Sequence, residues 1–473
     1  MLFSSTLFLY LFLPITLLLF YLAPQRLRNL ILLVASLVFY AWGGVSYTII
    51  LITSILLNYL FGYLIANANN RKLYLSLGVI TNLSLLVVFK YADFIVENIN
   101  NLFFATSSIE KLEQPNITLP IGISFFTFQA ISYLVDIYRK EAKYQKNLIN
   151  IALYISLFPQ LIAGPIVRYH DIAQQLIKRS FSLEKFGEGV ERFIIGLSKK
   201  VLLANNFALV ADKIFATDYH NLSSPTAWLG IISYSFQIYF DFSGYSDMAI
   251  GLGKMFGFSF LENFNFPYIS KNIKEFWRRW HISLSSWFKD YLYIPLGGSQ
   301  VAKHRIYINL LIVFTLTGLW HGASWSFLFW GLFHGLFLIL ERLGLQKILS
   351  KLWAPIQHLY TLLVVVIAWV FFRVESIEYA FTYLKQMFYS NVDNSDWFTY
   401  FDSQLSIVFI IGVLGSFGLF PYLGKQLKTV FNSKTRIADL MSFLYSTTLI
   451  ALLLLSSIFL LAGSYNPFIY FRF

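Results

Sequence analysis

The sequence contains no cysteine among its 473 residues, and only 13% of the residues are Asp, Glu, Lys or Arg. The absence of cysteine excludes a disulfide framework and an acyl group carried as a thioester on the chain itself. Soluble domains carry charge on about a quarter of their residues. The low charge therefore excludes an ordinary soluble protein, while the redox state of its compartment stays open.

Several motifs of metal and nucleotide chemistry are also missing. No two histidines have the i, i+4 spacing of a zinc-binding helix, and no G-x-S-x-G nucleophile elbow occurs. The sequence GLGK at 251–254 lacks the rest of a phosphate-binding loop, and there is no dinucleotide fingerprint. We therefore expect neither a bound metal nor a bound cofactor.

What the sequence does contain is apolar runs, since 57% of the residues are hydrophobic and 19% are aromatic. A membrane-spanning helix needs about 20 mostly apolar residues, so these runs predict about eleven spans in an all-α, polytopic transmembrane bundle. A single membrane domain is expected over residues 1–473, and some segments are short enough to be half-spans. The candidate segments are 2–22, 30–44, 47–66, 73–94, 119–138, 148–166, 227–252, 306–320, 325–340, 360–372, 405–423 and 441–462.

The net charge of +12 does not indicate nucleic-acid binding, because the basic residues lie in short loops between the apolar runs. This is the positive-inside pattern of a membrane protein, which makes the lipid bilayer its surroundings and places the N-terminus outside. Residues 1–22 have no positive n-region and no small-residue cleavage site, so they predict the first membrane helix and not a signal peptide. The basic residues that set the orientation are Arg26, Arg28, Arg71, Lys72, Arg139, Lys140, Lys143 and Lys146.

The alternation of basic loops fails after the sixth span, because Arg168, Lys178 and Arg179 fall where a loop should face outward. A re-entrant segment near residues 159–165 corrects the count, and such irregular backbone is tolerated only where protein or a water-filled cavity surrounds it. Residues 181–204 predict an amphipathic helix that lies in the interface or covers the bundle. Residues 262–299 are too charged to span and are broken by two prolines.

His321 lies in the sequence GLWHG, at the junction of two apolar runs. Ionisable residues at apolar depth in a membrane protein are functional candidates. A buried imidazole stays neutral and can accept a proton, which suits a general base acting on a hydroxyl that attacks an acyl carbonyl. Trp320 would line the same cavity. The alternative is a core histidine that is hydrogen-bonded to a backbone carbonyl.

His281 ends the sequence WRRWH. Arg278 and Arg279 could bind the phosphate of a coenzyme or carrier arm. Equally, together with the neighbouring tryptophans, they could anchor the chain at the membrane interface. His334 lies more than half a turn away from His321 on a straight helix with about 100° per residue, so it is a poor candidate for the same site.

Polar residues also occur inside apolar segments. Gln129 lies in one predicted span, and Asp241 and Ser243 lie in another. Acids at this depth usually face a cavity or pair with a base. We therefore expect these three residues to line a cavity, and Asp241 could orient an imidazole as the carboxylate of a catalytic triad does.

The sequences FWRRWHISLSSWFKDYLYIPLGG and GLWHGASWSFLFWGLFHG resemble those of the membrane-bound O-acyltransferase family. The resemblance extends over nearly the whole chain and includes LPIGISFFTFQAISYLVDIYR, PQLIAGPIVRY and QIYFDFSGYSDMAIGLGKMFGF. It favours the bacterial branch that contains alginate O-acetyltransferases, because the run LYIPLGG at 292–298 is similar to that branch. Relatives that D-alanylate teichoic acid share the plan of two histidines.

The resemblance implies a helical bundle around a central cavity or tunnel, with the catalytic histidine at His321 and a second functional histidine at His281. It implies transfer of an acetyl group from a cytoplasmic donor, acetyl-CoA or an acyl carrier, across the bacterial inner membrane. The acceptor would be an exported polysaccharide, of the alginate type or peptidoglycan. An extracytoplasmic partner of the SGNH-hydrolase type often completes such a transfer.

The chain ends NPFIYFRF, which looks like the aromatic tail of a small companion peptide in teichoic acid D-alanylation. Tyr470 is therefore a candidate acyl relay that His321 would activate. An aromatic anchor at the membrane interface is the alternative.

Functions of other classes stay open. A transporter that moves an acyl donor or lipid without chemistry would be favoured by inverted repeats, which the sequence does not show. A scaffold for a polysaccharide secretion complex would have no need of isolated histidines at apolar depth. Within the family, transfer of D-alanyl or another acyl group to a cell-envelope polymer is the alternative to acetyl transfer.

Overall fold

The computed structural model describes residues 1–103, 111–389, 396–419, 422–424, 436–463 and 465–469, and in these residues it contains helices and no strand. The helices are α1 (Leu13–Leu22), α2 (Arg28–Ala41), α3 (Val45–Asn67), α4 (Arg71–Phe103), α5 (Ile123–Arg139), α6 (Leu148–Ser156), α7 (Phe158–Leu161), α8 (Tyr169–Ile177), α9 (Leu183–Ser198), α10 (Asn205–Phe215), α11 (Ser224–Met255), α12 (Ile273–Arg279), α13 (Ile282–Phe288), α14 (Lys303–His321), α15 (Trp325–Leu340), α16 (Gln346–Leu349), α17 (Ala354–Arg373), α18 (Ile377–Tyr389), α19 (Ser403–Ser416) and α21 (Arg436–Ala462). The predicted all-α class is confirmed.

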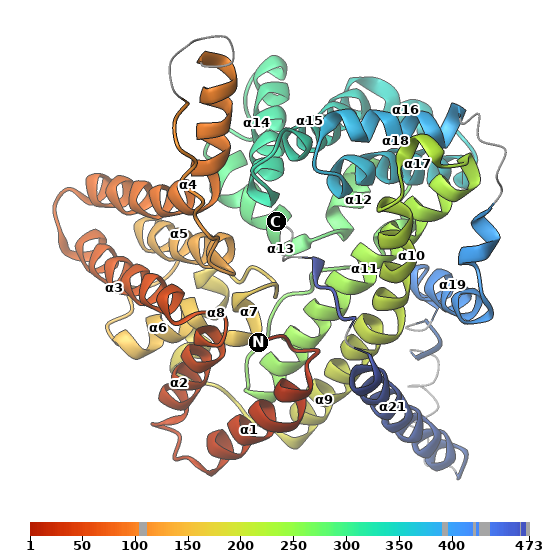
Figure 1. Cartoon of the computed structure of the whole chain (residues 1–473). Coiled ribbons are helices and arrows are strands. Elements are labelled where there is room, and N and C mark those ends of the chain that lie inside the picture. Colours follow the sequence, from red (N-terminus) through yellow and green to blue (C-terminus); the bar gives the residue numbers. More distant parts are fainter. Residues whose placement is uncertain (104–110, 390–395, 420–421, 425–435, 464, 470–473) are drawn as a thin grey trace.

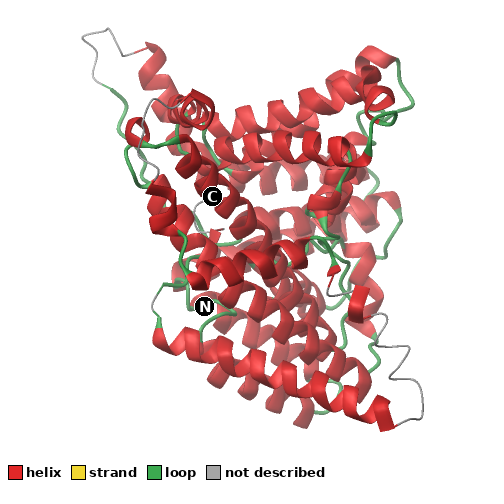
Figure 2. Ribbon diagram, turned by 90° about the vertical axis from the view of Figure 1, so that its right-hand side faces the viewer, coloured by secondary structure: helices red, strands yellow, loops and turns green. Residues whose placement is uncertain are grey.

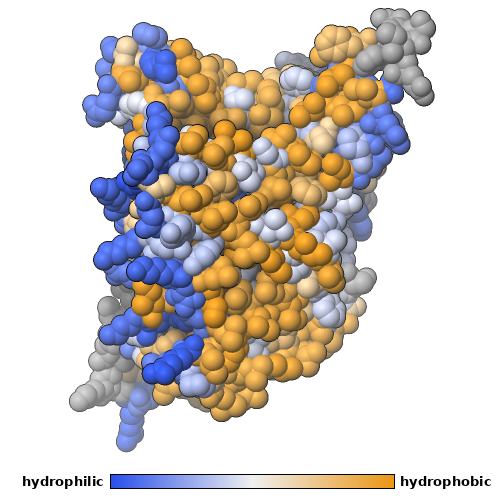
Figure 3. Space-filling view, turned by 90° about the vertical axis from the view of Figure 1, so that its left-hand side faces the viewer, coloured by the Kyte–Doolittle hydropathy of each residue, from blue (hydrophilic) through white to orange (hydrophobic). Residues whose placement is uncertain are grey.

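The outer surface of the bundle has the character of a membrane protein. Among the described residues, six helices are long and apolar enough to cross a bilayer, so the predicted number of about eleven spans is not confirmed. Figure 3 shows a broad apolar face over the first helices, with hydrophilic side chains gathered along one edge. Apolar side chains such as Leu18, Val38, Ile49 and Ile80 are about half exposed there or more. This surface would be unfavourable in water and is suited to lipid.

Helix α11 runs through the middle of the bundle (Figure 1). Every residue from 237 to 253 is buried, including the polar ones, because α9, α10, α17 and α18 pack around the helix. In Figure 1 the helices α1–α4 lie along the left of the bundle and α14–α18 along its top, and Figure 2 shows the same bundle from the side. The centre of the protein is therefore built around a helix that carries polar side chains.

The amphipathic helix predicted over 181–204 does not end there, which corrects the sequence interpretation. Helix α9 continues through a π-helical turn (Lys199–Ala204) into α10, and the continuous helix Leu183–Phe215 is long and apolar enough to span. Its apolar face packs on α11 at very close range, because a Cβ atom at Gly196 would lie 2.6 Å from the Gly244 carbonyl oxygen. The amphipathic pattern therefore reflects packing against another helix.

The segment predicted to be irregular near 159–165 is indeed broken. The short helices α6 and α7 meet at Leu157, and every residue from 150 to 167 is buried. Gly122, at φ +79°, lets the start of α5 approach the Leu161 carbonyl oxygen. Irregular backbone is thus surrounded by protein, as a membrane interior requires. Residues 262–299 contain only short helical pieces, among them α12 and α13, in agreement with the prediction that they do not span.

Candidate active site

His321 is the last residue of α14, and its side chain is buried. The position depends on glycine, because a Cβ atom at Gly318 would clash with the Phe327 carbonyl oxygen and one at Gly331 with the Phe314 carbonyl oxygen. Helices α14 and α15 can therefore touch backbone to backbone, which brings the Trp330 ring of α15 to 5.2 Å from the His321 ring.

His281 lies between α12 and α13 and is fully buried. Its backbone has φ +44°, a left-handed conformation that is uncommon for a residue with a side chain and that costs free energy. Asn263 holds the ring, with its Oδ1 atom 3.2 Å from His281 Nδ1 and 2.8 Å from Ser283 Oγ. Because an amide oxygen only accepts hydrogen bonds, His281 Nδ1 carries the proton in this contact. Nε2 of the neutral ring is then the acceptor.

The two histidines share one aromatic neighbour, Trp320. Its ring centroid lies 6.1 Å from that of His281 and 5.0 Å from that of His321. The family resemblance implied that both histidines are functional, and the structure brings them to the same tryptophan. Trp330 also contacts His334, whose Nδ1 atom accepts a hydrogen bond from Trp277.

His321 lines two cavities. One has a volume of about 110 Å³ and is also lined by Lys90, Gly122, Ser124, Ile162 and Trp320. The other, of about 10 Å³, is also lined by Ile238, Phe242, Trp280, Trp330, Trp369, Phe372 and Ile469. The larger has room for a small polar or acyl group, and the smaller for no more than about one water molecule. His321 therefore lies beside mostly apolar enclosures, where its imidazole could act as a base on a bound group.

Lys90 of α4 reaches the end of α14 at this site. Its ammonium group donates hydrogen bonds to the carbonyl oxygens of Trp320, at 2.5 Å, and His321, at 3.2 Å, and lies 3.3 Å from Ser124 Oγ. The last carbonyl groups of a helix have no partner within the helix and carry partial negative charge. Lys90 satisfies two of them and so fixes the backbone that carries His321.

Residues 43–348 match the model of the membrane-bound O-acyltransferase family. The chain belongs to this family.

As a membrane-bound O-acyltransferase, the protein has several curated relatives. The probable alginate O-acetylase AlgI of Pseudomonas putida is 43% identical over 496 residues and covers 100% of both chains. The protein of the same name from Azotobacter vinelandii is 46% identical over 395 residues, which is 82% of this chain and 78% of the relative. The peptidoglycan O-acetyltransferase of Helicobacter pylori is 40% identical over 427 residues, with 82% and 80% covered. The chain is therefore an acyltransferase, as predicted.

Three buried polar residues were predicted to line a cavity. None of the three is among the described residues that line the two cavities at His321. These three are Gln129, Asp241 and Ser243. The contacts of the Asp241 carboxylate do not support the hypothesis that this residue orients an imidazole. Asp241 Oδ1 lies 2.8 Å from Lys200 Nζ, and Oδ2 accepts a hydrogen bond from the Ile469 backbone at 2.9 Å. Tyr470 lies outside the described residues.

Arg278 and Arg279 lie on α12 beside an open cavity of about 420 Å³. Arg278 is exposed, and Arg279 pairs with Glu275 at 2.9 Å. Lys274 and Glu275 line the same cavity, so its rim carries three basic side chains and one acidic side chain. The phosphate contacts considered from the sequence remain a prediction.

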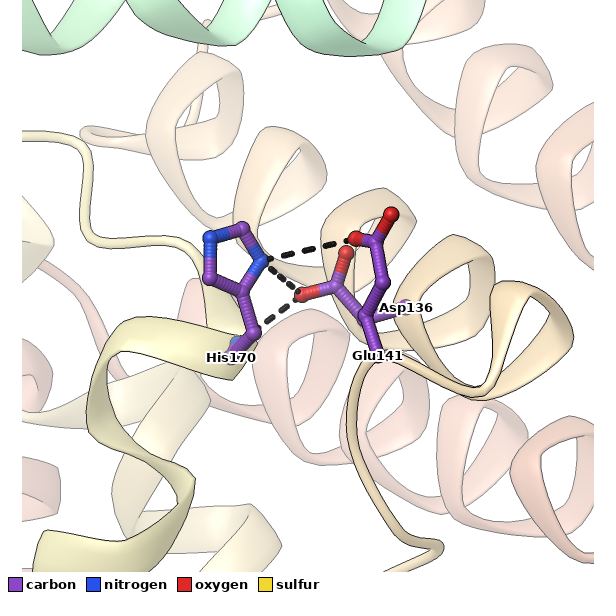
Figure 4. Close-up of side chains that lie close together, drawn as sticks. All are labelled: Asp136, Glu141 and His170. Carbon is purple, nitrogen blue, oxygen red and sulfur yellow. Dashed lines mark hydrogen bonds and ion pairs between the residues drawn. The ribbon is translucent and has the colours of Figure 1, made fainter.

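A second polar cluster joins α5, the loop that follows it, and α8 (Figure 4). Ligand atoms of Asp136, Glu141 and His170 lie within 4.8 Å of one another, and this is the one group of the described residues with metal-binding spacing. Hydrogen bonds already occupy the Asp136 carboxylate: Oδ1 accepts from Tyr291 at 2.6 Å, and Oδ2 lies 2.9 Å from the His170 backbone nitrogen and 3.0 Å from Nδ1. These bonds account for the cluster without an ion, and we assign no metal to it.

Two residues of the site were missed in the sequence. Lys90 had a visible signal, because it is the one basic residue inside the apolar segment 73–94. Charged residues in such a segment are expensive and usually functional. Asn263 had no comparable signal, since it lies in a loop and reaches His281 only through the folding of residues 262–283.

Proposed function

We propose that this acyltransferase passes an acetyl group from a cytoplasmic donor across the membrane for O-acetylation of an extracytoplasmic polysaccharide, with His321 as the general base. The observation that carries the proposal is the position of His321, buried at two cavities and sharing Trp320 with His281. The names of the relatives support acetyl as the group and alginate or peptidoglycan as the acceptor. The bacterial inner membrane is the compartment that separates such a polymer from a cytoplasmic donor.

The chemistry of one transfer step follows from these groups. The hydroxyl group that accepts the acetyl group gives its proton to a ring nitrogen of His321. The oxygen of this hydroxyl attacks the carbonyl carbon of the acetyl thioester. The carbon–sulfur bond breaks, and the thiolate of the donor leaves and takes up the proton. His281, whose Nδ1 atom bonds Asn263, is proposed to assist through its Nε2 atom as a hydrogen-bond acceptor. The aromatic walls keep bulk water from competing for the acetyl group.

The donor is acetyl-CoA or an acyl carrier, and both bring a phosphate group. The basic rim of the α12 cavity, with Lys274, Arg278 and Arg279, supports this choice. Loss of Arg278 should raise KM for the donor with little change in kcat, because the contact is made equally before and during the reaction. A change in kcat alone would contradict donor binding at this rim.

Tyr470 is proposed as an intermediate carrier of the acetyl group, as an ester on its phenol oxygen. Ile469, the residue before it, lines the smaller cavity with His321, which supports this role. Tyr470→Phe should then abolish O-acetylation at normal protein levels, and full activity would end the relay. An extracytoplasmic partner of the SGNH-hydrolase type would take the acetyl group from the carrier to the polymer.

The deciding experiment is His321→Ala, with ester-linked acetate measured on the isolated polysaccharides of cells that express the variant. Loss of acetate from one polymer, with the protein present in the membrane, would support the proposal and identify the acceptor. His220→Ala is the matched control, because His220 is exposed in a short turn. Unchanged acetate in His321→Ala would favour a transporter or a scaffold, and D-alanyl ester in place of acetate would favour the alternative acyl group.

A further inference from the structure

Two opposite charges face each other in the middle of the bundle. Lys200 and Asp241 are 2.8 Å apart, with only 1% and 2% of their side-chain surfaces exposed. Burying two charges is costly, and apolar replacements of a buried ion pair are often neutral or stabilising. An ion pair at this depth therefore needs a function beyond holding α9 and α11 together.

Both residues of the pair also form hydrogen bonds with the segment 465–469, which we call the C-terminal segment. Asp241 Oδ2 accepts a hydrogen bond from the Ile469 backbone at 2.9 Å, and Lys200 donates one to the Pro467 carbonyl oxygen. Lys200 is also bonded to Asn205 Oδ1 at 2.9 Å. The ion pair thus supplies one acceptor and one donor to a stretch of backbone that forms no regular helix. In a membrane interior such backbone is stable only when its polar groups are satisfied in this way.

Other residues of the C-terminal segment also form hydrogen bonds or pack in the core of the bundle. Asn466 donates to the Ser4 carbonyl oxygen at 2.6 Å, and its Oδ1 atom lies 3.3 Å from Asn205 Nδ2. The Phe468 ring lies 4.8 Å from that of Tyr245, and both Phe468 and Ile469 are 4% exposed. Figure 1 shows this end of the chain entering the centre of the bundle close to the N-terminus.

The local sequence explains how Lys200 comes to face inward. It lies in the π-helical turn that joins α9 to α10, and such an irregular turn shifts the direction of side chains within a helix. Close contact between Gly196 and Gly244 sets α9 against α11 just before this turn. Asp241 is on the facing side of α11, and its neighbour Phe242 lines the smaller cavity together with His321 and Ile469. The ion pair therefore stands next to the wall of the catalytic cavity.

We infer that the Lys200–Asp241 pair is the docking site of the C-terminal segment, and that the docked segment is a working part of the acyl-transfer site. Lys200 and Asp241 are positioning residues: they act through the backbone of residues 467–469, which they hold beside His321. The docking stands on the contacts described, whereas its requirement for activity rests on the proposed function.

A single thiol can report the docking, because the chain has no cysteine. Ile469→Cys places this thiol at a buried position, where a maleimide should react slowly. In the Ile469→Cys background, the double variant Lys200→Met with Asp241→Leu removes both charges without leaving one unpaired. We expect its thiol to react about tenfold faster or more, as for a segment that opens locally, and we expect O-acetylation to be lost while the protein remains folded in detergent.

The outcomes separate the docking from the reaction. A thiol that stays protected in the double variant would overturn the docking site. Rapid labelling with full O-acetylation would overturn the requirement for the segment. His321→Ala should lose activity with the thiol still protected, so a failure of the proposed function would be seen independently of the labelling.

Should the double variant fail to fold, Asn466→Ala is the second test. It leaves Lys200 and Asp241 intact and removes the bonds of the segment to Ser4 and Asn205. Faster labelling together with reduced acetylation is expected, and unchanged labelling and activity would contradict the inference.

Discussion

The ammonium group of Lys90 lies 3.2 Å from the backbone carbonyl oxygen of His321, on a different helix. It also bonds the Trp320 carbonyl oxygen, so a positive charge from α4 caps the carbonyl end of α14. The candidate base is thus fixed through its backbone from one side, and the aromatic rings of Trp320 and Trp330 pack against its imidazole.

Replacement of Lys90 by methionine should reduce O-acetylation by at least about tenfold, because the last carbonyl groups of α14 lose their donor and His321 loses its fixed position. The length of the side chain is kept, so the protein should still insert. Ester-linked acetate per unit of membrane protein is the measurement. Lys72→Met, an exposed change at the start of the same helix, is the control. Equal activity in both variants would show that Lys90 does not position the site.

Gly318→Ala should destabilise the protein by about 1–3 kcal/mol, because the added methyl group would be forced against the backbone of α15. The thermal unfolding midpoint in detergent measures the effect. Gly187→Ala is the matched control, since a Cβ atom there meets nothing within 4 Å and alanine is the better helix former. A Gly318 variant as stable as the control would contradict the close contact between α14 and α15.

Asn263→Ala should lower kcat more than it changes KM for the donor, because His281 would lose the partner that selects its tautomer. The measurement is acetyl transfer by purified protein at several donor concentrations. Asn82→Ala is the control, since Asn82 is equally buried but bonds Asn58 in the contact between α3 and α4. A loss of the same size in both variants would point to a general effect on stability.

Stability should depend on the protonation of His170. Hydrogen bonding to Asp136 is the main cause that raises the pKa of His170 above its ordinary value of 6.5, Asp171 adds to it, and burial and Arg168 oppose it. Because the folded protein favours the charged ring, this stabilisation is complete below pH 6.5 and is lost as the pH rises through the raised pKa.

The thermal midpoint of the native protein should therefore fall, on going to mildly alkaline pH, by more than that of His170→Gln. His304→Gln is a control, because His304 is an exposed histidine near the start of α14. The same pH dependence in all three proteins would show that His170 is not the group that titrates.

The sequence predicted those helices that depend on residues close together in the chain. Apolar runs with short loops predicted the helices, including α15 with the same bounds, and the failure of the alternating basic loops indicated the irregular segment near 159–165. His321 was found because a histidine between glycines in an apolar run is unusual in itself.

Contacts between distant residues were not predictable in the same way. Asp241 was recognised as unusual, but its partner Lys200 lies in another helix, where a π-helical turn directs it inward. Nothing in the periodicity of residues 181–204 marks that turn, so the helix was predicted as amphipathic and too short. Asn263 and Ile469 likewise reach the site only through the packing of separate segments.

Residues 466–469 are translated after every helix that they contact. The cavity beside His321 therefore gains the side chain of Ile469 only when α21 has already left the ribosome. Until this segment has been made, the enclosure at His321 lacks the part of its wall that Ile469 forms.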